Sequence, residues 1–128
     1  SAPGNSRKII TVGSYDFAER TDVIPSSHSG AGPTFSCIKK PDVVAPGSHI
    51  ISCCPPAKTN GSFYSKKSGT SMSTPIVSGA IALLLSKYPS MSPRETKIRL
   101  KNSSTDLALP HTRQGWGYLS IPSLLSTF

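Results

Sequence analysis

The sequence predicts an α/β fold with a central parallel strand and a buried helix, and three observations support this prediction. A β-branched run at 8–13 ends in glycine, as expected of a central parallel strand. The segment 72–87 is apolar almost all the way round a helix, which indicates a buried helix. The other strand candidates are few and short, so they supply little cover for that helix. We therefore expect an incomplete domain.

The first half of the chain alternates short strands with turns. Residues 1–6 form a turn-rich lead-in, and 15–33 is polar and irregular, with a loop of serines and glycines at its centre. Pro41 and Pro46 bound a short apolar core, so any strand between them lies near an edge or a bend. The expected strands are 8–13, 34–37, 43–45 and 49–53.

The apolar helix is preceded by residues suited to capping. Thr70 is the expected N-cap, which leaves Ser71 at the first helical position. Pro75 has no N–H to donate to the Ser71 carbonyl, so we expect a disturbed first turn that contacts elsewhere must offset. The polar loop before the helix contains Phe63 and Tyr64, which can pair on a sheet edge.

A second helix has a clear start signal. Ser92 is the expected N-cap, Pro93 suits the first helical position, and Glu95 completes a capping box. The helix should run to about Asn102 and lie on the surface, because its apolar residues stand among lysines and arginines. A last apolar stretch, ending at Phe128, closes the chain.

Length and charge exclude several classes of protein. A chain of 128 residues is long enough for one modest core. The net charge of +8 comes from scattered lysines and arginines without a basic stripe or interleaved aromatic residues, so we expect no nucleic-acid partner. The longest apolar run is too short to cross a bilayer, so we expect no membrane segment.

The three cysteines give neither a disulfide framework nor a metal motif. Cys53 and Cys54 are sequence neighbours, which rarely bridge each other, and no Cys-x-x-Cys spacing occurs. We therefore expect Cys37, Cys53 and Cys54 to be small buried or partly buried thiols, and we expect neither metal nor cofactor.

Ser71 stands at the mouth of the apolar helix, where unpaired N–H groups and the helix dipole favour negative charge. An oxyanion can be held at such a place. A serine near a helix start is nevertheless most often a cap, and the residues around it must decide between the two interpretations.

The segment Gly69-Thr70-Ser71-Met72-Ser73-Thr74-Pro75, followed by Val77 and Gly79, closely resembles the nucleophile signature of subtilisin-like serine proteases. Ser73 stands where an alanine is more usual. Four further segments resemble the family and occur in the family's order, namely 3–13, 27–34, 40–47 and 115–117.

The resemblance implies roles for particular residues. Ser71 is the nucleophile and its N–H an oxyanion donor, while Thr70 supplies an outer hydroxyl donor. Ala2, Pro3 and Gly4 line one wall of the specificity pocket. A peptide or protein is then the substrate. Some family members bind a weak cation through backbone carbonyls in this lead-in, but the pattern does not place a metal here.

The family also requires an aspartate strand motif, a His-Gly-Thr helix motif and an Ala-Ala-Gly-Asn oxyanion loop, which lie N-terminal to the matched segments and do not occur in this sequence. His28, His49 and His111 do not follow the base motif and are expected in solvated or packing roles. Asp42 is expected to hydrogen-bond at a strand end.

The resemblance implies that residues 1–128 are the C-terminal half of a subtilisin-like peptidase domain, with an α/β fold that consists of a partial doubly wound, mainly parallel sheet and flanking helices. This half is expected to be inactive alone because its serine lacks a base. The missing N-terminal half is its expected partner, and the fragment alone is expected to self-associate through its uncovered helix. The alternative is a non-proteolytic relative that keeps the fold to bind a partner or a pro-segment.

Overall fold

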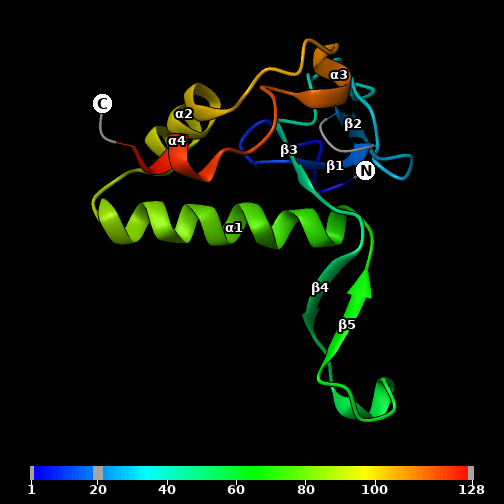
Figure 1. Ribbon diagram of the computed structural model, residues 1–128. Helices are drawn as coiled ribbons and strands as arrows, with labels where there is room; N and C mark the ends of the chain where they lie inside the picture. Colours follow the sequence, from blue (N-terminus) through cyan, green and yellow to red (C-terminus); the bar gives the residue numbers. More distant parts are fainter. Residues whose placement is uncertain (1, 19–21, 127–128) are drawn as a thin grey trace.

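The computed structural model describes residues 2–18 and 22–126 and has the predicted α/β architecture (Figure 1). Its elements, in chain order, are β1 (Val12–Ala18), β2 (Asp22–Pro25), β3 (Val43–Pro46), β4 (Ile50–Cys53), the 3-10 turn η1 (Pro56–Lys58), β5 (Tyr64–Lys67), α1 (Thr70–Lys87), α2 (Pro93–Ser103), α3 (His111–Gln114) and α4 (Ile121–Leu125).

One sheet has the order β2-β1-β3, with β1 parallel to β3 and antiparallel to β2. The strand expected at 8–13 is central, as predicted, but it begins only at Val12 and continues to Ala18. The prediction that 15–33 is irregular is therefore wrong in part. Strands β1 and β2 pair with each other, and this pairing provides hydrogen-bond partners for the backbone of the polar residues there. Before Val12 the Arg7 and Ile9 carbonyls accept from the ammonium group of Lys97.

The strand predicted at 34–37 is wrong. The Cys37 N–H donates to the Thr34 carbonyl, and the Ile38 N–H donates to the Thr34 hydroxyl, which closes a tight turn. Cys37 has a φ of 57°, a left-handed conformation outside the β region that regular strand residues adopt. The short strand predicted at 43–45 is correct: β3 lies at the end of the sheet order and is buried.

The strand predicted at 49–53 is β4, which forms an antiparallel hairpin with β5. Tyr64 pairs with Cys53 in this hairpin, as the sequence suggested, so part of the predicted polar loop is a strand. Figure 1 shows the hairpin projecting away from the N-terminal end of α1. Ile51, Phe63 and Tyr64 are exposed on it.

Helix α1 packs against the sheet and α4 with one face only. Its buried residues Ser73, Val77, Ala80 and Leu84 recur at helical spacing and meet β3 and the C-terminal helices in the core. The opposite face is open, and Leu83 is 52% exposed. The helix predicted to be buried on all sides is thus covered on one side by the described residues.

Helix α2 has the predicted cap in full. The Ser92 hydroxyl accepts the Glu95 N–H at 3.2 Å, and the Glu95 carboxylate accepts the Ser92 N–H at 2.7 Å. The polar face lies outside with Ile98 exposed, while Leu100 is completely buried in the core. The expected closing segment contains α4, and its end at 127–128 lies outside the described residues.

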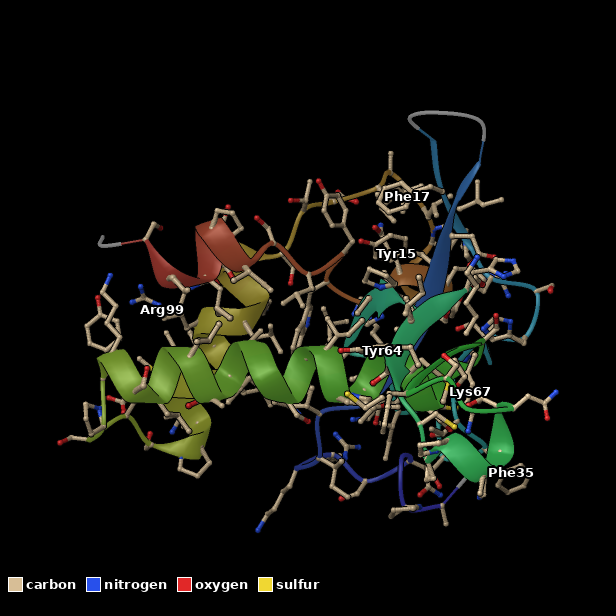
Figure 2. All side chains as sticks on the ribbon, turned by 60° about the horizontal axis from the view of Figure 1, so that its bottom comes forward. Tyr15, Phe17, Phe35, Tyr64, Lys67 and Arg99 are labelled. Carbon is tan, nitrogen blue, oxygen red and sulfur yellow. The ribbon has the colours of Figure 1, made fainter. Side chains whose placement is uncertain are left out.

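Basic side chains attach α4 to the other helices. The Arg99 Nε donates to the Leu124 carbonyl at 2.9 Å, and the Lys87 ammonium donates to the Leu125 carbonyl at 2.7 Å. Figure 2 shows Arg99 beside α4 and α2. Cations therefore satisfy carbonyls at the C-terminal end of α4, where the helix dipole favours positive charge.

The cysteine prediction is only partly correct. Cys54 is buried, but Cys37 and Cys53 are exposed, because the turn and the hairpin that carry them project from the core; all three are free thiols. Within residues 2–18 and 22–126, no helix combines the length and apolar character needed to span a bilayer.

Candidate active site

Ser71 is exposed at the second position of α1, two residues from a glycine cap. Gly69, not Thr70, is the N-cap, and no side chain caps this helix. An N-cap needs non-helical backbone angles, and Gly69 has a φ of 147°, which glycine adopts readily and other residues rarely do. The turn into the helix is therefore made at Gly69, and Thr70 is already helical.

The segment between β3 and β4 anchors this turn from outside. The Gly69 N–H donates to the Gly47 carbonyl at 2.7 Å, and the His49 N–H donates to the Ser68 hydroxyl at 2.9 Å. Gly47 is packed so closely that a Cβ there would overlap the hydroxyls of Ser14 and Ser73. Only a glycine therefore fits at position 47, between the hydroxyls of Ser14 and Ser73.

Pro75 lies inside α1, and the helix continues through it to Lys87. Its missing N–H leaves the Ser71 carbonyl without the usual helical donor. The neighbouring Thr74 hydroxyl donates to the Thr70 carbonyl at 2.9 Å, and the Met72 N–H donates to the Gly69 carbonyl at 2.9 Å. Local bonds of this kind hold the first turn in shape beside the proline.

A pocket of about 600 Å³ lies beside the helix start. Ala2, Pro3 and Gly4, which were expected to line a pocket wall, line it together with Thr70, which was expected to supply a hydroxyl donor. The far wall was not predicted and consists of the loop 30–35 with Lys40 and Pro41. The resemblance of 27–34 to a loop of the family was the one sequence signal for this wall, but it did not indicate that the loop faces Ala2, Pro3 and Gly4.

Phe35 stands at the rim of this pocket and is fully exposed. Figure 2 shows it at the outer edge of the molecule. The turn 34–38 that carries it is closed by hydrogen bonds, so the ring is presented by an ordered backbone.

A buried ion pair fixes the wall formed by the lead-in. The Lys40 ammonium lies 2.6 Å from the Asp42 Oδ2 and also donates to the Ile9 carbonyl at 2.7 Å. The same Asp42 oxygen accepts the Thr11 N–H at 2.7 Å, which confirms Asp42 as a hydrogen-bonder at the strand end. The Thr11 hydroxyl in turn donates to the Gly4 carbonyl. This chain of contacts runs from β3 to the pocket wall.

The exposed His28 reaches a separate network of buried serines. The Ser26 hydroxyl donates to the Asp16 carboxylate at 2.6 Å, and the Ser14 and Ser26 hydroxyl oxygens are 2.8 Å apart. Since each hydroxyl has one proton, Ser14 donates to Ser26 and accepts from the His28 Nε2 at 3.2 Å. His28 is therefore solvent-exposed and hydrogen-bonded to this network, in line with the solvated or packing role that was expected of it.

Partial burial raises the pKa of Asp16, but the hydroxyls of Ser26 and Ser48 and two nearby histidines lower it more, so its net pKa is below the ordinary value. The carboxylate stays ionised and fixes the direction of the hydrogen bonds. His49 is exposed and His111 is half-buried, also in line with the sequence prediction.

The part of the chain that the structure describes contains no group of three or more histidine, cysteine or acidic side chains placed to hold a metal ion. Two carbonyls that follow the lead-in accept from lysine ammonium groups: Lys97 donates to the Arg7 carbonyl at 2.7 Å, and Lys40 donates to the Ile9 carbonyl at 2.7 Å.

Comparison with known proteins identifies the family. The model of the subtilase family matches residues 1–117, and the chain therefore belongs to the subtilase family. The chain is 41% identical over 116 residues to the serine protease AprX of Bacillus subtilis (strain 168), an alignment that covers 81% of this chain and 26% of AprX.

Solved structures give the same family. Fervidolysin from Fervidobacterium pennivorans, a keratinolytic enzyme related to subtilisin, has a TM-score of 0.82 and 25% identity and matches 97% of this chain. The CspB protease of Clostridium perfringens has a TM-score of 0.77 and 30% identity and matches 96% of it. The chain spans only 20% and 27% of these two structures, and the fold is that of a partial subtilisin-like domain.

Proposed function

We propose that residues 1–128 are the C-terminal half of a subtilisin-like catalytic domain whose whole protein is a serine endopeptidase, with Ser71 as the nucleophile of a Ser-His-Asp triad. The observation that carries the proposal is the position of Ser71. It is exposed on the first turn of α1, and its neighbour Thr70 lines a pocket with Ala2, Pro3 and Gly4.

The chemistry follows from this position. The Ser71 Oγ attacks the carbonyl carbon of a peptide bond while a histidine accepts its proton, and an aspartate orients that histidine. The oxygen that becomes negative is stabilised by the Ser71 N–H, which has no acceptor within the helix because it belongs to the first turn. Thr70, half-buried at the pocket, supplies a further hydroxyl.

The histidine and the aspartate are proposed to come from a segment that precedes this chain in the whole protein. His28 supports this assignment because its hydrogen bond goes to Ser14 in the buried network. The open face of α1 also supports it, since an apolar helix face is normally covered in a complete domain. The substrates are then peptides or proteins.

A fluorophosphonate tests the proposal on the full-length protein that contains this chain. In an active triad the Ser71 oxygen forms a bond to phosphorus, fluoride leaves, and the histidine takes the serine proton. We expect one covalent label per molecule, mapped to Ser71 by mass spectrometry of proteolytic peptides, and loss of peptide hydrolysis on labelling.

Two serine variants on the same helix give the control. Ser71→Ala should abolish labelling and hydrolysis, whereas Ser78→Ala, an exposed serine two turns further along, should keep both. A folded full-length protein that takes no label, or takes it at another serine, would contradict the proposal. If its upstream segment also lacks the histidine or the aspartate, the protein is instead a scaffold that binds a partner or a pro-segment.

A further inference from the structure

We propose that Ser73 is a positioning residue that holds Ser71 in register by attaching the first turn of α1 to β3. This inference rests on the proposed function of Ser71. Ser73 occupies the position where an alanine is more usual in the family signature, and its side chain is completely buried. A buried hydroxyl is costly without a partner, and this one donates to the Ala45 carbonyl at 3.1 Å.

Two hydrogen bonds to the same short segment flank Ser71. Two residues before it, the Gly69 N–H donates to the Gly47 carbonyl at 2.7 Å. Two residues after it, the Ser73 hydroxyl donates to the Ala45 carbonyl. The turn that presents Ser71 is therefore attached on both sides to the end of β3, which is a buried strand of the sheet.

The first turn of α1 needs support from outside because its own interactions are incomplete. Gly69 provides no side-chain cap, and its backbone is the most flexible of any residue type. Pro75 removes the N–H that would bond the Ser71 carbonyl. The bond from Ser73 supplies an attachment inside the helix, between the uncapped start and the proline.

Packing makes the attachment specific. The hydroxyls of Ser73 and Ser14 both lie against Gly47, with no room for a Cβ between them. Because Ser14 belongs to β1 and Ala45 to β3, the Ser73 side chain is held where two parallel strands meet the helix. A helix start so confined cannot shift along its axis without breaking this contact.

The test compares Ser73→Ala with Ser78→Ala in the full-length protein. Since misplacing a catalytic group by about 1 Å can cost on the order of 100-fold in rate, we expect Ser73→Ala to lower kcat by roughly 10-fold to 100-fold with KM unchanged. Ser73→Cys, which keeps a weak donor on a slightly larger side chain, should fall between wild type and Ser73→Ala. Ser78→Ala should match wild type.

Amide hydrogen exchange gives a readout that does not depend on catalysis. Ser73→Ala should speed exchange in segment 69–73 and leave the α2 amides unchanged, whereas Ser78→Ala should change neither. Exchange that is unaltered in Ser73→Ala overturns the inference, as does faster exchange with wild-type kcat. A loss of kcat that is fully accounted for by a lower free energy of unfolding of the whole protein would also overturn the inference, since Ser73 would then only support the fold.

The two proposals fail in different ways. If the wild-type full-length protein neither hydrolyses peptides nor takes a fluorophosphonate, the proposed function is wrong and the exchange data alone decide whether Ser73 holds the turn. If the wild type is active and Ser73→Ala is equally active, the function stands and the positioning role is wrong.

Discussion

Asp42 joins three parts of the molecule through one buried carboxylate. Its oxygens accept from the Thr11 N–H and from Lys40, and the Lys97 ammonium lies 3.8 Å away. Lys40 and Asp42 are both only 5% exposed. Burial of an ion pair contributes little net stability, but removal of one partner leaves the other charge without compensation. The lead-in and its pocket wall therefore depend on this carboxylate.

We predict that Asp42→Ala lowers the free energy of unfolding by about 3–5 kcal/mol, because Lys40 is left as a buried, unpaired charge. Urea denaturation of the full-length protein measures the loss. Lys97→Ala is the control, since its ammonium is farther away and more exposed, and it should cost less than about 1 kcal/mol. Equal losses in the two variants would show that the Lys40–Asp42 pair is not the critical contact.

Prediction at the scale of residues was wrong where two neighbouring residues competed for one role. The sequence assigned the N-cap of α1 to Thr70, whereas the structure has Gly69 there; the role of Ser71 as nucleophile stays a prediction. Threonine is on average a better N-cap than glycine because its hydroxyl can accept a backbone N–H. Here, however, the residue before the helix has a positive φ and donates its N–H to the Gly47 carbonyl, and glycine adopts that φ readily. That requirement comes from a residue 22 positions away.

At the scale of elements, α2 is specified locally. Its cap involves only Ser92 and Glu95, within one turn of chain, and all its parts were predicted. Hydrogen bonds from the Ser92 backbone and side chain lower the pKa of Glu95. The lowered pKa means that the folded protein favours the ionised Glu95 carboxylate. The carboxylate therefore makes its full contribution to stability above the ordinary glutamate pKa, and this contribution is lost as the pH falls through the lowered pKa of the folded state.

We predict that Ser92→Ala reduces the stability of the protein by about 1 kcal/mol near neutral pH, because the Glu95 N–H loses its acceptor. Glu95→Gln should keep most of the stability at neutral pH, since an amide oxygen can accept the same bond from the Ser92 N–H. The variant should lack the loss of stability at acidic pH that protonation of Glu95 causes. Thermal unfolding between neutral and acidic pH measures both effects. An unchanged acid profile in Glu95→Gln would contradict the assignment.

Strand β1 shows the limit of prediction for elements. Its β-branched beginning was recognised, but its polar continuation to Ala18 was not, because the hydrophobic pattern that marks a strand ends there. Pairing with β2 supplies the backbone partners instead. The reverse error at 34–37 has the same origin: the residues suit a strand, but no neighbouring strand pairs with them there, and a turn satisfies their backbone groups locally.

At the scale of the whole molecule, α1 has one covered face and one open face. Its buried face meets β1, β3 and α4, while Leu83 is exposed outside that face. Apolar surface of this kind is usually covered by another part of the domain or by another molecule. The proposed N-terminal half is the covering element in the full-length protein.

We predict that the 128-residue chain alone associates with itself through this open face. Leu83→Glu should shift the sedimentation coefficient toward that of a monomer, because a charge in place of this exposed leucine cannot be buried cheaply between two copies of the chain. Ile98→Glu is the matched control, an apolar residue on α2 with a similar exposure of 48%, and should leave association unchanged. A monomeric wild-type chain, or equal effects of the two variants, would refute this role of α1.

The sequence by itself determined the family, the serine that reacts in the proposed function, the capping of α2 and the apolar character of α1. These features depend on residue order within a few positions, where capping, helical spacing and motif chemistry act directly. Tertiary structure alone decided the strand limits, the cap at Gly69, the far wall of the pocket and the bond from Ser73 to Ala45. Each of those depends on backbone groups that find partners far along the chain, and a local pattern does not specify such partners.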